Sequence, residues 1–106
     1  MRVIITGGCG FLGQMLARSI LRRGSLASHT RGSEISVAVR EMYLVDVSRP
    51  PTLMFEELET DPVSVKLGSV ADASFCASLF AGITEHISVF HLGAVMWATS
   101  YYNLLY

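Results

Sequence analysis

Cysteine is scarce in this sequence, which has only two in 106 residues, Cys9 and Cys76. They lie far apart and match neither the ligand spacing of a metal site nor the paired spacing of a disulfide-stabilised domain. We expect both to be reduced and structural. The alternative is a redox role for Cys9, because the N-terminus of a helix beside it would lower the pKa of its thiol.

An excess of one charge and long apolar runs are missing as well. The formal net charge is −1, and no cluster of lysine and arginine supplies the positive surface that binding to a phosphate backbone requires, so nucleic acid is not an expected partner. The first apolar run, Val3 to Ile5, is too short for a signal peptide, and no run approaches the roughly 18 residues of a membrane span. We therefore expect a cytoplasmic protein that does not contact a membrane.

What the sequence does contain is the composition of a small globular domain, since 51% of its residues are hydrophobic and 16% are charged. A chain of this length builds a single hydrophobic core at most. Residues 2–6 form a short β-branched run that predicts a strand, and residues 7–10 form a glycine turn. Residues 11–23 carry apolar side chains at helical spacing, and Gly24 follows as a stop signal, so the strand leads directly into a helix.

Further strand and helix patterns follow in alternation. Strands are predicted at residues 42–47, 63–67 and 87–92, and a short helix at residues 72–81. The polar segment 25–36 is expected to be a loop, and the acidic segment 48–62 an irregular connection at the solvated surface. Strands that alternate with helices form parallel sheets with right-handed crossovers. The predicted class is therefore α/β: a partial doubly wound Rossmann fold, with a parallel sheet of about four strands and flanking helices.

The turn at residues 6–13 reads T-G-G-C-G-F-L-G and carries the strongest functional signal. It contains G-x-x-G-x-x-G at Gly7, Gly10 and Gly13 and, in an offset register, G-x-G-x-x-G at Gly8, Gly10 and Gly13. In such turns the first glycine permits a tight bend, the middle one lets the backbone approach a pyrophosphate, and the last lets the helix pack on the strand. The anion then lies on the helix N-terminus. A turn with only a structural purpose is the alternative.

Asp46 ends the second predicted strand, 33 residues after Gly13. That separation exceeds the roughly 20 residues typical of the acid that binds the cofactor ribose, and the excess corresponds to the segment 25–36. A carboxylate at this point accepts hydrogen bonds from the adenosine ribose and repels a 2′-phosphate, so it favours NAD over NADP. An aspartate in a solvated loop is the alternative.

Four segments together resemble one family. The glycine turn, L-V-D at residues 44–46, G-S-V-A-D at residues 68–72 and V-F-H-L-G-A at residues 89–94 are similar to the extended short-chain dehydrogenases, also called NAD-dependent epimerase/dehydratases. Within that family, the G-F-L-G-Q turn, the insertion before the second strand and L-V-D-V followed by Pro-Pro are most similar to the D-erythronate dehydrogenase branch. The resemblance covers about residues 1–96.

The resemblance implies cofactor contacts for individual residues. The residues expected to line the pyrophosphate of NAD are Gly7, Gly10, Phe11 and Leu12. Asp46 is expected to bind the adenine ribose. These five positions all belong to the first βαβ unit, so the same unit would hold the adenine ribose and both phosphates.

Two later segments match the rest of the family's cofactor site. Ser69 and Val70 occupy the pair that flanks the adenine ring, with serine where the family usually has aspartate. Leu92, Gly93 and Ala94 match the H-L-A-A turn that passes beneath the cofactor, with Gly93 in place of the first alanine. The resemblance therefore implies that the cofactor NAD(H) is the partner of this chain.

The catalytic residues of that family have no counterpart here. By resemblance, such enzymes use a tyrosine as acid/base, a lysine four residues later and a serine or threonine that orients the substrate. The sequence has one lysine, Lys66, and Pro62 stands four positions before it. We therefore predict no catalytic residue in this chain, and we expect His91 to be a packed core histidine rather than a base.

Residues 1–96 are expected to form an N-terminal NAD-binding Rossmann half, and residues 97–106 an unmatched tail at a truncated or mispredicted terminus. Three functions stay open. The first is the NAD(H)-binding portion of an oxidoreductase that acts on a hydroxyl-bearing sugar acid or nucleotide sugar, with its small-molecule substrate bound only by a full-length form. The others are a non-catalytic dinucleotide-binding module and a nonfunctional fragment.

Overall fold

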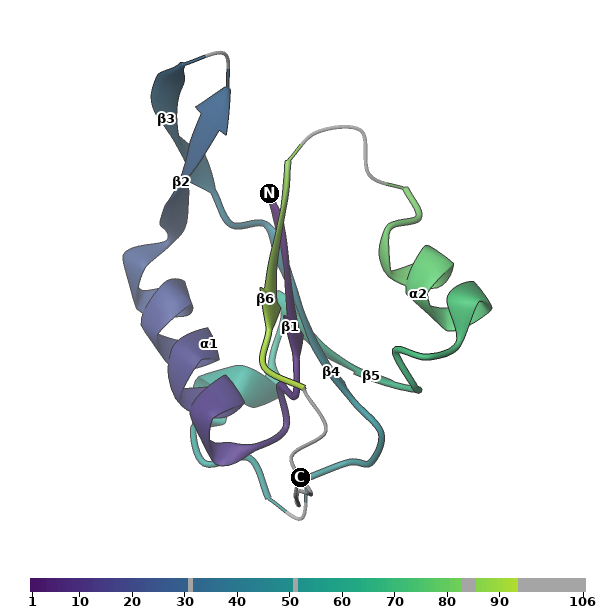
Figure 1. Cartoon of the computed structure of the whole chain (residues 1–106). Coiled ribbons are helices and arrows are strands. Elements are labelled where there is room, and N and C mark those ends of the chain that lie inside the picture. Colours follow the sequence, from purple (N-terminus) through teal and green to yellow (C-terminus); the bar gives the residue numbers. More distant parts are fainter. Residues whose placement is uncertain (31, 51, 83–85, 94–106) are drawn as a thin grey trace, which may run out of the picture.

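The computed structural model describes residues 1–30, 32–50, 52–82 and 86–93 (Figure 1). Strands alternate with helices, apart from one inserted hairpin. In chain order the elements are β1 (Arg2–Thr6), α1 (Phe11–Arg23), β2 (Ser25–Thr30), β3 (Ser33–Ala38), β4 (Glu41–Asp46), η1 (Glu56–Glu59), β5 (Val63–Leu67), α2 (Ala73–Leu79) and β6 (Ile87–His91). Within these described ranges, no helix is long and apolar enough to cross a membrane.

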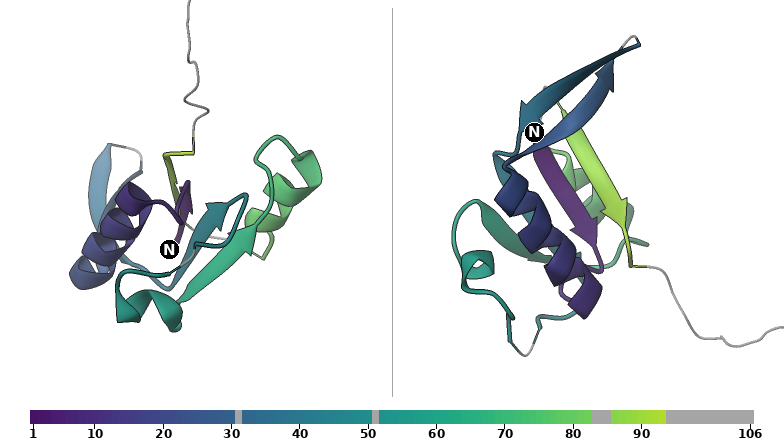
Figure 2. Two further views of the ribbon diagram at one scale, coloured as in Figure 1. Left: turned by 90° about the horizontal axis from the view of Figure 1, so that it is seen from below. Right: turned by 90° about the vertical axis from the view of Figure 1, so that its left-hand side faces the viewer.

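Four strands form one parallel sheet in the order β5-β4-β1-β6. Helix α1 covers one face of this sheet and α2 lies on the other, as the views along and across the strands show (Figure 2). Parallel strands with helices on both faces are the arrangement of a doubly wound sheet. The predicted partial Rossmann-like fold is therefore confirmed.

The core on the α1 side combines alternate residues of the two central strands with the inner stripe of the helix. Side chains on a strand alternate between faces, so every second residue of β1 and β4 points to this side. The buried residues of this cluster are Met1, Val3, Ile5, Ala17, Ile20, Met42, Leu44 and Leu58. Gly24 ends α1 in the left-handed conformation, with φ +77°, and its N–H donates to the carbonyl of Ile20.

A smaller core lies on the α2 side. Ile4 and Val45, which alternate with the residues of the first cluster, pack there with Leu79 of α2. Asp72 caps α2, and its carboxylate accepts hydrogen bonds from the N–H groups of Ser74 and Phe75. The short helix therefore has a capped N-terminus, and Leu79 packs its C-terminal end on the sheet.

The segment predicted as a loop at residues 25–36 is instead an antiparallel hairpin of β2 and β3. Leu26 and Val37, opposite each other in the register, are half-buried and pack against the α1-side core. Gly24 and Val39 close the base of the hairpin through a backbone hydrogen bond of 2.9 Å. The prediction was wrong because small and polar residues dominate both strands, and pairing between them compensates for weak strand propensity.

The connection between β4 and β5 is also less solvated than expected. It contains the 3₁₀ helix η1, whose Leu58 is 1% exposed and belongs to the α1-side core. Glu57 forms an ion pair with Arg18 of α1 at 3.0 Å, and the Arg18 guanidinium lies 4.4 Å from the centre of the Phe55 ring. Glu56, Glu57 and Asp61 are exposed, but the segment that carries them is packed on α1.

Candidate functional site

The loops that follow the four parallel strands meet at one edge of the sheet. Strand β1 lies between β4 and β6, and the chain leaves β1 for β4 on one side before it returns to β6 on the other. In open α/β sheets, the crevice where the strand order reverses in this way is where ligands bind. The glycine turn after β1 and the turn after β6 stand on the two sides of that point, at the bottom of Figure 1.

The glycine turn is built by close backbone contacts. Gly7 has φ +70°, in the left-handed region that favours glycine. A Cβ at Gly8 would lie 2.7 Å from the carbonyl oxygen of Ile5, and a Cβ at Gly13 would lie 2.5 Å from that of Gly7. Gly10 has more room, since the nearest atom to its Cβ position would be at 3.4 Å. The turn itself therefore requires glycine at positions 7, 8 and 13. Gly10 instead leaves space beside the helix N-terminus.

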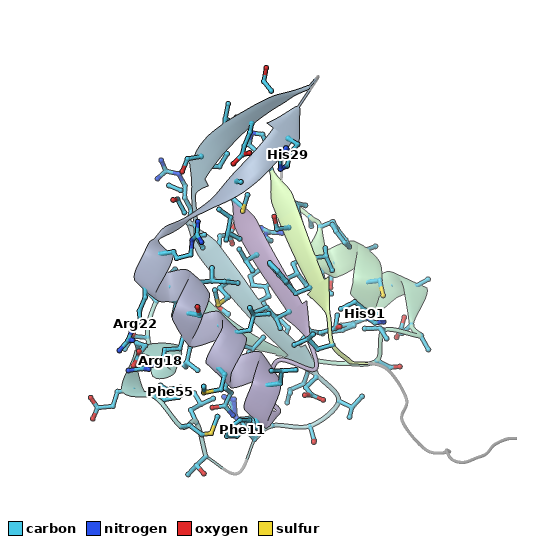
Figure 3. All side chains as sticks on the ribbon, turned by 60° about the vertical axis from the view of Figure 1, so that its left-hand side comes forward. Phe11, Arg18, Arg22, His29, Phe55 and His91 are labelled. Atoms are coloured by element: carbon cyan, nitrogen blue, oxygen red, sulfur yellow. The ribbon has the colours of Figure 1, made fainter. Side chains whose placement is uncertain are left out.

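Helix α1 begins at Phe11 with Gly10 as its N-cap. Within the described part of the chain no side chain caps this end, and the first turn contains no acidic residue. Phe11 (Figure 3) is 70% exposed and Leu12 is 65% exposed, so the first two residues of the helix face outward. An uncapped helix N-terminus offers backbone N–H groups and a partial positive charge to an anion.

Asp46 reaches from the end of β4 to the glycine turn. Its Oδ2 accepts a hydrogen bond from the N–H of Cys9 at 3.2 Å, and its Oδ1 accepts one from the N–H of Val47 at 2.8 Å. A carboxylate has about four acceptor positions, so these two bonds leave capacity for further donors. Asp46 therefore stands beside the turn and also braces it, a role that the sequence did not predict.

Cys9 has a raised pKa, caused first by burial and then by the negative charge of Asp46, with a smaller opposing effect of Arg49. A raised pKa lowers the thiolate fraction at neutral pH, and the thiolate is the reactive form. This direction favours the expected structural role and argues against the redox alternative. Both Cys9 and Cys76 are free thiols.

Ser69 and Val70 follow β5 at the same edge of the sheet. The hydroxyl oxygen of Ser69 accepts a hydrogen bond from the N–H of Ala71 at 3.1 Å, and the carbonyl of Val70 accepts one from the Cys76 thiol at 3.2 Å. The Ser69 side chain is exposed and Val70 is 44% exposed. Both are accessible to a ligand that lies over the ends of β4 and β5.

The end of β6 is joined to the end of β1. The N–H of Leu92 donates to the carbonyl of Thr6 at 3.1 Å, and the N–H of Gly93 donates to the Thr6 hydroxyl at 3.1 Å. A Cβ at Gly93 would lie 3.0 Å from the nitrogen of Gly7, so the two turns are in direct contact. Ala94, the third predicted residue of this turn, and the tail at 97–106 lie outside the described residues.

His91 is not the core histidine that the sequence predicted. It is exposed, and its Nδ1 lies 2.7 Å from the hydroxyl oxygen of Thr6 (Figure 3). The burial pattern of β6 explains the difference, because this strand pairs only with β1 among the described residues and Val89 is 49% exposed. Among the described residues, a side chain on β6 therefore has a neighbouring strand on one side only.

Two residues of this region were missed by the sequence interpretation. Gln14 is 3% exposed and hydrogen bonds to the glycine turn and to the segment after β4, and Thr6 joins β1 to β6. A signal existed for Gln14, since it is a polar residue on the inward stripe of α1. The sequence offered no signal for the role of Thr6, because threonine is common at strand ends.

Elsewhere in the described part of the chain, the candidate binding sites are less well supported. A hollow of about 330 Å³ on the outer surface of α1 contains none of the predicted site residues; its lining is Met15, Arg18, Ser19, Arg22 and Arg23. In the described ranges, no group of three or more His, Cys, Asp or Glu side chains is placed to hold a metal ion.

A similarity to a known protein adds to these observations. No family model matches the chain. It is 36% identical over 96 residues to a protein of Cupriavidus necator named D-erythronate dehydrogenase, an alignment that covers 91% of this chain and 26% of that protein. The chain thus spans about a quarter of the length of the curated relative it matches. This similarity supports a dehydrogenase relationship, and it agrees with the predicted resemblance at that level.

Proposed function

We propose that this chain is the NAD(H)-binding portion of an NAD-dependent oxidoreductase of the extended short-chain dehydrogenase type. Residues 1–96 form the binding half in this proposal, and its location is cytoplasmic. The similarity to a dehydrogenase supports an oxidoreductase and a nicotinamide cofactor. The choice of NAD, the family and the residues are inferred from the site.

One observation carries the proposal: Asp46 and the glycine turn, which lie far apart in the sequence, are in contact through the 3.2 Å hydrogen bond between the Cys9 N–H and Oδ2 of Asp46. The pyrophosphate of a dinucleotide is bound at a helix N-terminus, and its adenosine ribose is bound by an acid at the end of the neighbouring strand. Here these two groups belong to adjacent parallel strands, β1 and β4.

Each part of the cofactor has a proposed contact. The pyrophosphate lies on the backbone at Gly10, Phe11 and Leu12, and Asp46 accepts hydrogen bonds from the ribose hydroxyls. The adenine ring lies over the end of β5, where Ser69 and Val70 are exposed. The turn at Leu92 and Gly93, which lies against the glycine turn, would pass beneath the cofactor on the other side of β1.

The bound cofactor would supply the acceptor or donor of a hydride. The residues of this chain bind and orient the dinucleotide, since the sequence lacks the tyrosine and lysine pair of the family. The substrate, a hydroxyl-bearing sugar acid or nucleotide sugar in this proposal, belongs to the rest of a longer protein. The name of the relative, D-erythronate dehydrogenase, supports that substrate class, because erythronate is a sugar acid.

Isothermal titration calorimetry of the purified chain with NAD⁺ and NADP⁺ tests the proposal. The informative variant is Asp46→Asn, which keeps one acceptor oxygen for the Cys9 N–H, removes the charge and gives up the bond from the Val47 N–H. Asp72→Asn is the matched control, because it changes the net charge equally while asparagine still caps α2. We expect NAD⁺ to bind more tightly than NADP⁺, Asp46→Asn to weaken NAD⁺ binding and reduce this preference, and Asp72→Asn to change neither.

A folded chain that binds neither nucleotide would contradict the proposal. Equal losses in the two variants would show that charge in general, rather than Asp46, governs binding.

A non-catalytic dinucleotide-binding module is the second candidate, since the glycine turn and Asp46 account for nucleotide binding without any catalytic residue. Both candidates predict that this chain binds the nucleotide. They differ in whether a longer protein that contains the chain transfers hydride. Hydride transfer to NAD⁺ by a longer form of the protein that contains this segment would support the oxidoreductase. Nucleotide binding without hydride transfer in such a form would support the module.

A further inference from the structure

Gln14 is a buried polar side chain on α1 that uses both ends of its carboxamide. Its Nε2 donates to the carbonyl oxygen of Cys9 at 3.0 Å, and its Oε1 accepts from the N–H of Met54 at 2.7 Å. The residue is 3% exposed. A carbonyl can only accept and an N–H can only donate, so the two partners fix the orientation of the amide group.

The Cys9 residue is held from both sides by this arrangement. Its N–H donates to Asp46 at 3.2 Å, and its carbonyl accepts from Gln14. The following N–H, that of Gly10, donates to the carbonyl of Gly7 at 3.2 Å. Each of these bonds fixes a peptide group between the end of β1 and the start of α1. The Cys9 carbonyl oxygen is directed to Gln14, on the buried side of the helix.

The direction of that carbonyl matters at an anion site. A carbonyl oxygen carries a partial negative charge, and a phosphate is stabilised by N–H groups and the positive end of the helix. A Cys9 peptide rotated outward would present its oxygen beside the first turn of α1. Gln14 opposes that rotation because it supplies the hydrogen bond that satisfies the carbonyl in the buried position.

Met54 connects the same amide to the segment that follows Asp46. The segment is also fastened to α1 independently, through the Arg18 ion pair with Glu57 and the Arg18 contact with Phe55. Gln14 hydrogen bonds to both the glycine turn and the segment after β4. The ion pair and the aromatic contact of Arg18 both lie in the segment after β4.

We propose that Gln14 is a positioning residue of the dinucleotide site, which keeps the Cys9 carbonyl away from the phosphates and holds the glycine turn and the segment after Asp46 in register. This inference rests on the proposed function. Gln14 does not touch the cofactor, and it acts through the Cys9 peptide.

The test compares NAD⁺ affinity and thermal stability in Gln14→Met and Arg18→Gln. Gln14→Met removes both hydrogen bonds at similar volume and leaves the Cys9 carbonyl without its partner, so we expect NAD⁺ to bind about tenfold more weakly. Arg18→Gln loosens the segment after β4 and spares the turn. We expect its NAD⁺ affinity to stay within about twofold of wild type, even if its melting temperature falls.

Gln14→Glu supplies a pH profile that a general loss of packing would not produce. At neutral pH the introduced carboxylate cannot donate to the Cys9 carbonyl and adds negative charge near the phosphates. Burial raises the pKa of such a carboxyl, and the protonated form again has one donor and one acceptor. We expect its affinity relative to wild type to recover as the pH falls from about 7.5 to about 5.5. Asp46, Cys9 and His91 are the titratable groups near this turn and Arg49 is a charged one, so the wild type measured at each pH serves as the correction for them.

The outcomes separate the two proposals. Normal NAD⁺ affinity in Gln14→Met, or a pH-independent deficit in Gln14→Glu, would overturn the role of Gln14 and leave the proposed function standing. Failure of the wild type to bind would remove the proposed function. In that case alkylation of Cys9 in a Cys76→Ser background still tests the positioning, since release of the turn should make labelling faster in Gln14→Met than in Arg18→Gln. If Gln14→Met does not fold, the pH profile of Gln14→Glu decides.

Discussion

Gly7 and Gly93 lie against each other across the ends of β1 and β6. A Cβ on Gly7 would come within 3.0 Å of the Cα of Gly93, and a Cβ on Gly93 would come within 3.0 Å of the nitrogen of Gly7. The two strands are next to each other in the sheet although more than 80 residues separate them in the chain. The contact therefore joins the glycine turn to the opposite side of the point where the strand order reverses.

The two glycines should differ in their tolerance of alanine. Gly7→Ala combines the close contact with φ +70°, which disfavours any L-residue by about 1–2 kcal/mol. Gly93→Ala meets the contact alone, and the resembling family has alanine at this position. We expect Gly7→Ala to lower the free energy of unfolding in urea by at least about 1 kcal/mol more than Gly93→Ala. Equal effects would show that the contact, rather than the backbone conformation, limits both positions.

Arg2 fastens the end of α2 to the sheet. It is 5% exposed, and its Nη1 donates to the carbonyls of Leu79 at 2.7 Å and Ala81 at 2.8 Å, while its Nε and Nη2 donate to Glu41. Arg2→Met should lower the free energy of unfolding by about 2–3 kcal/mol, because several charge-assisted hydrogen bonds are lost. Arg2→Lys keeps the charge without the planar group and should show a smaller loss.

Chemical denaturation monitored by circular dichroism measures both Arg2 variants. Glu41→Gln is the control for the ion pair at 3.0 Å, and we expect its loss to be smaller than that of Arg2→Met. A loss in Glu41→Gln as large as that in Arg2→Met would assign the effect to the ion pair and contradict the role of the α2 carbonyls.

Stability should fall with rising pH above the ordinary pKa of a thiol. Burial is the first cause that raises the pKa of both Cys9 and Tyr43 in the folded chain. The unfolded chain then loses these protons first, so it binds fewer protons than the native state and the free energy of unfolding decreases as pH rises. Denaturation in urea between pH 7 and 10 measures the slope. Cys9→Ala should flatten the part that begins near pH 8.5, and an unchanged slope would exclude a contribution of Cys9.

The hairpin should be dispensable for nucleotide binding. It projects from the end of the sheet opposite to the glycine turn (Figure 1), and Gly24 and Val39 at its base are joined by a hydrogen bond of 2.9 Å. We expect replacement of residues 25–38 by a two-residue turn to leave NAD⁺ affinity within about twofold. The melting temperature should fall, because Leu26 and Val37 no longer cover the core. A large loss of affinity in a folded variant would show that the two ends of the sheet are coupled.

The sequence by itself determined the order of the four parallel strands and the two α-helices, and the parts of the candidate site that lie close together in the chain. Val3 and Ile5 alternate in a short apolar run, the glycines follow at once, and the helix begins at Phe11, as expected from local patterns alone. The four strands of the parallel sheet were found within one or two residues of their bounds, because each is a compact apolar run bordered by turn residues. Asp46 was identified by its position at a strand end.

The tertiary structure decided what depends on neighbours distant in sequence. The hairpin forms because Leu26 and Val37 find the core, and Leu58 is buried because η1 packs on α1. His91 is exposed because β6 has a described partner on one side only. Gln14 faces the Cys9 carbonyl and the Met54 N–H, partners that its own position on the helix does not reveal. Hydrophobic periodicity reports which face of an element is buried, but burial and hydrogen-bond partners are set by what packs against that face.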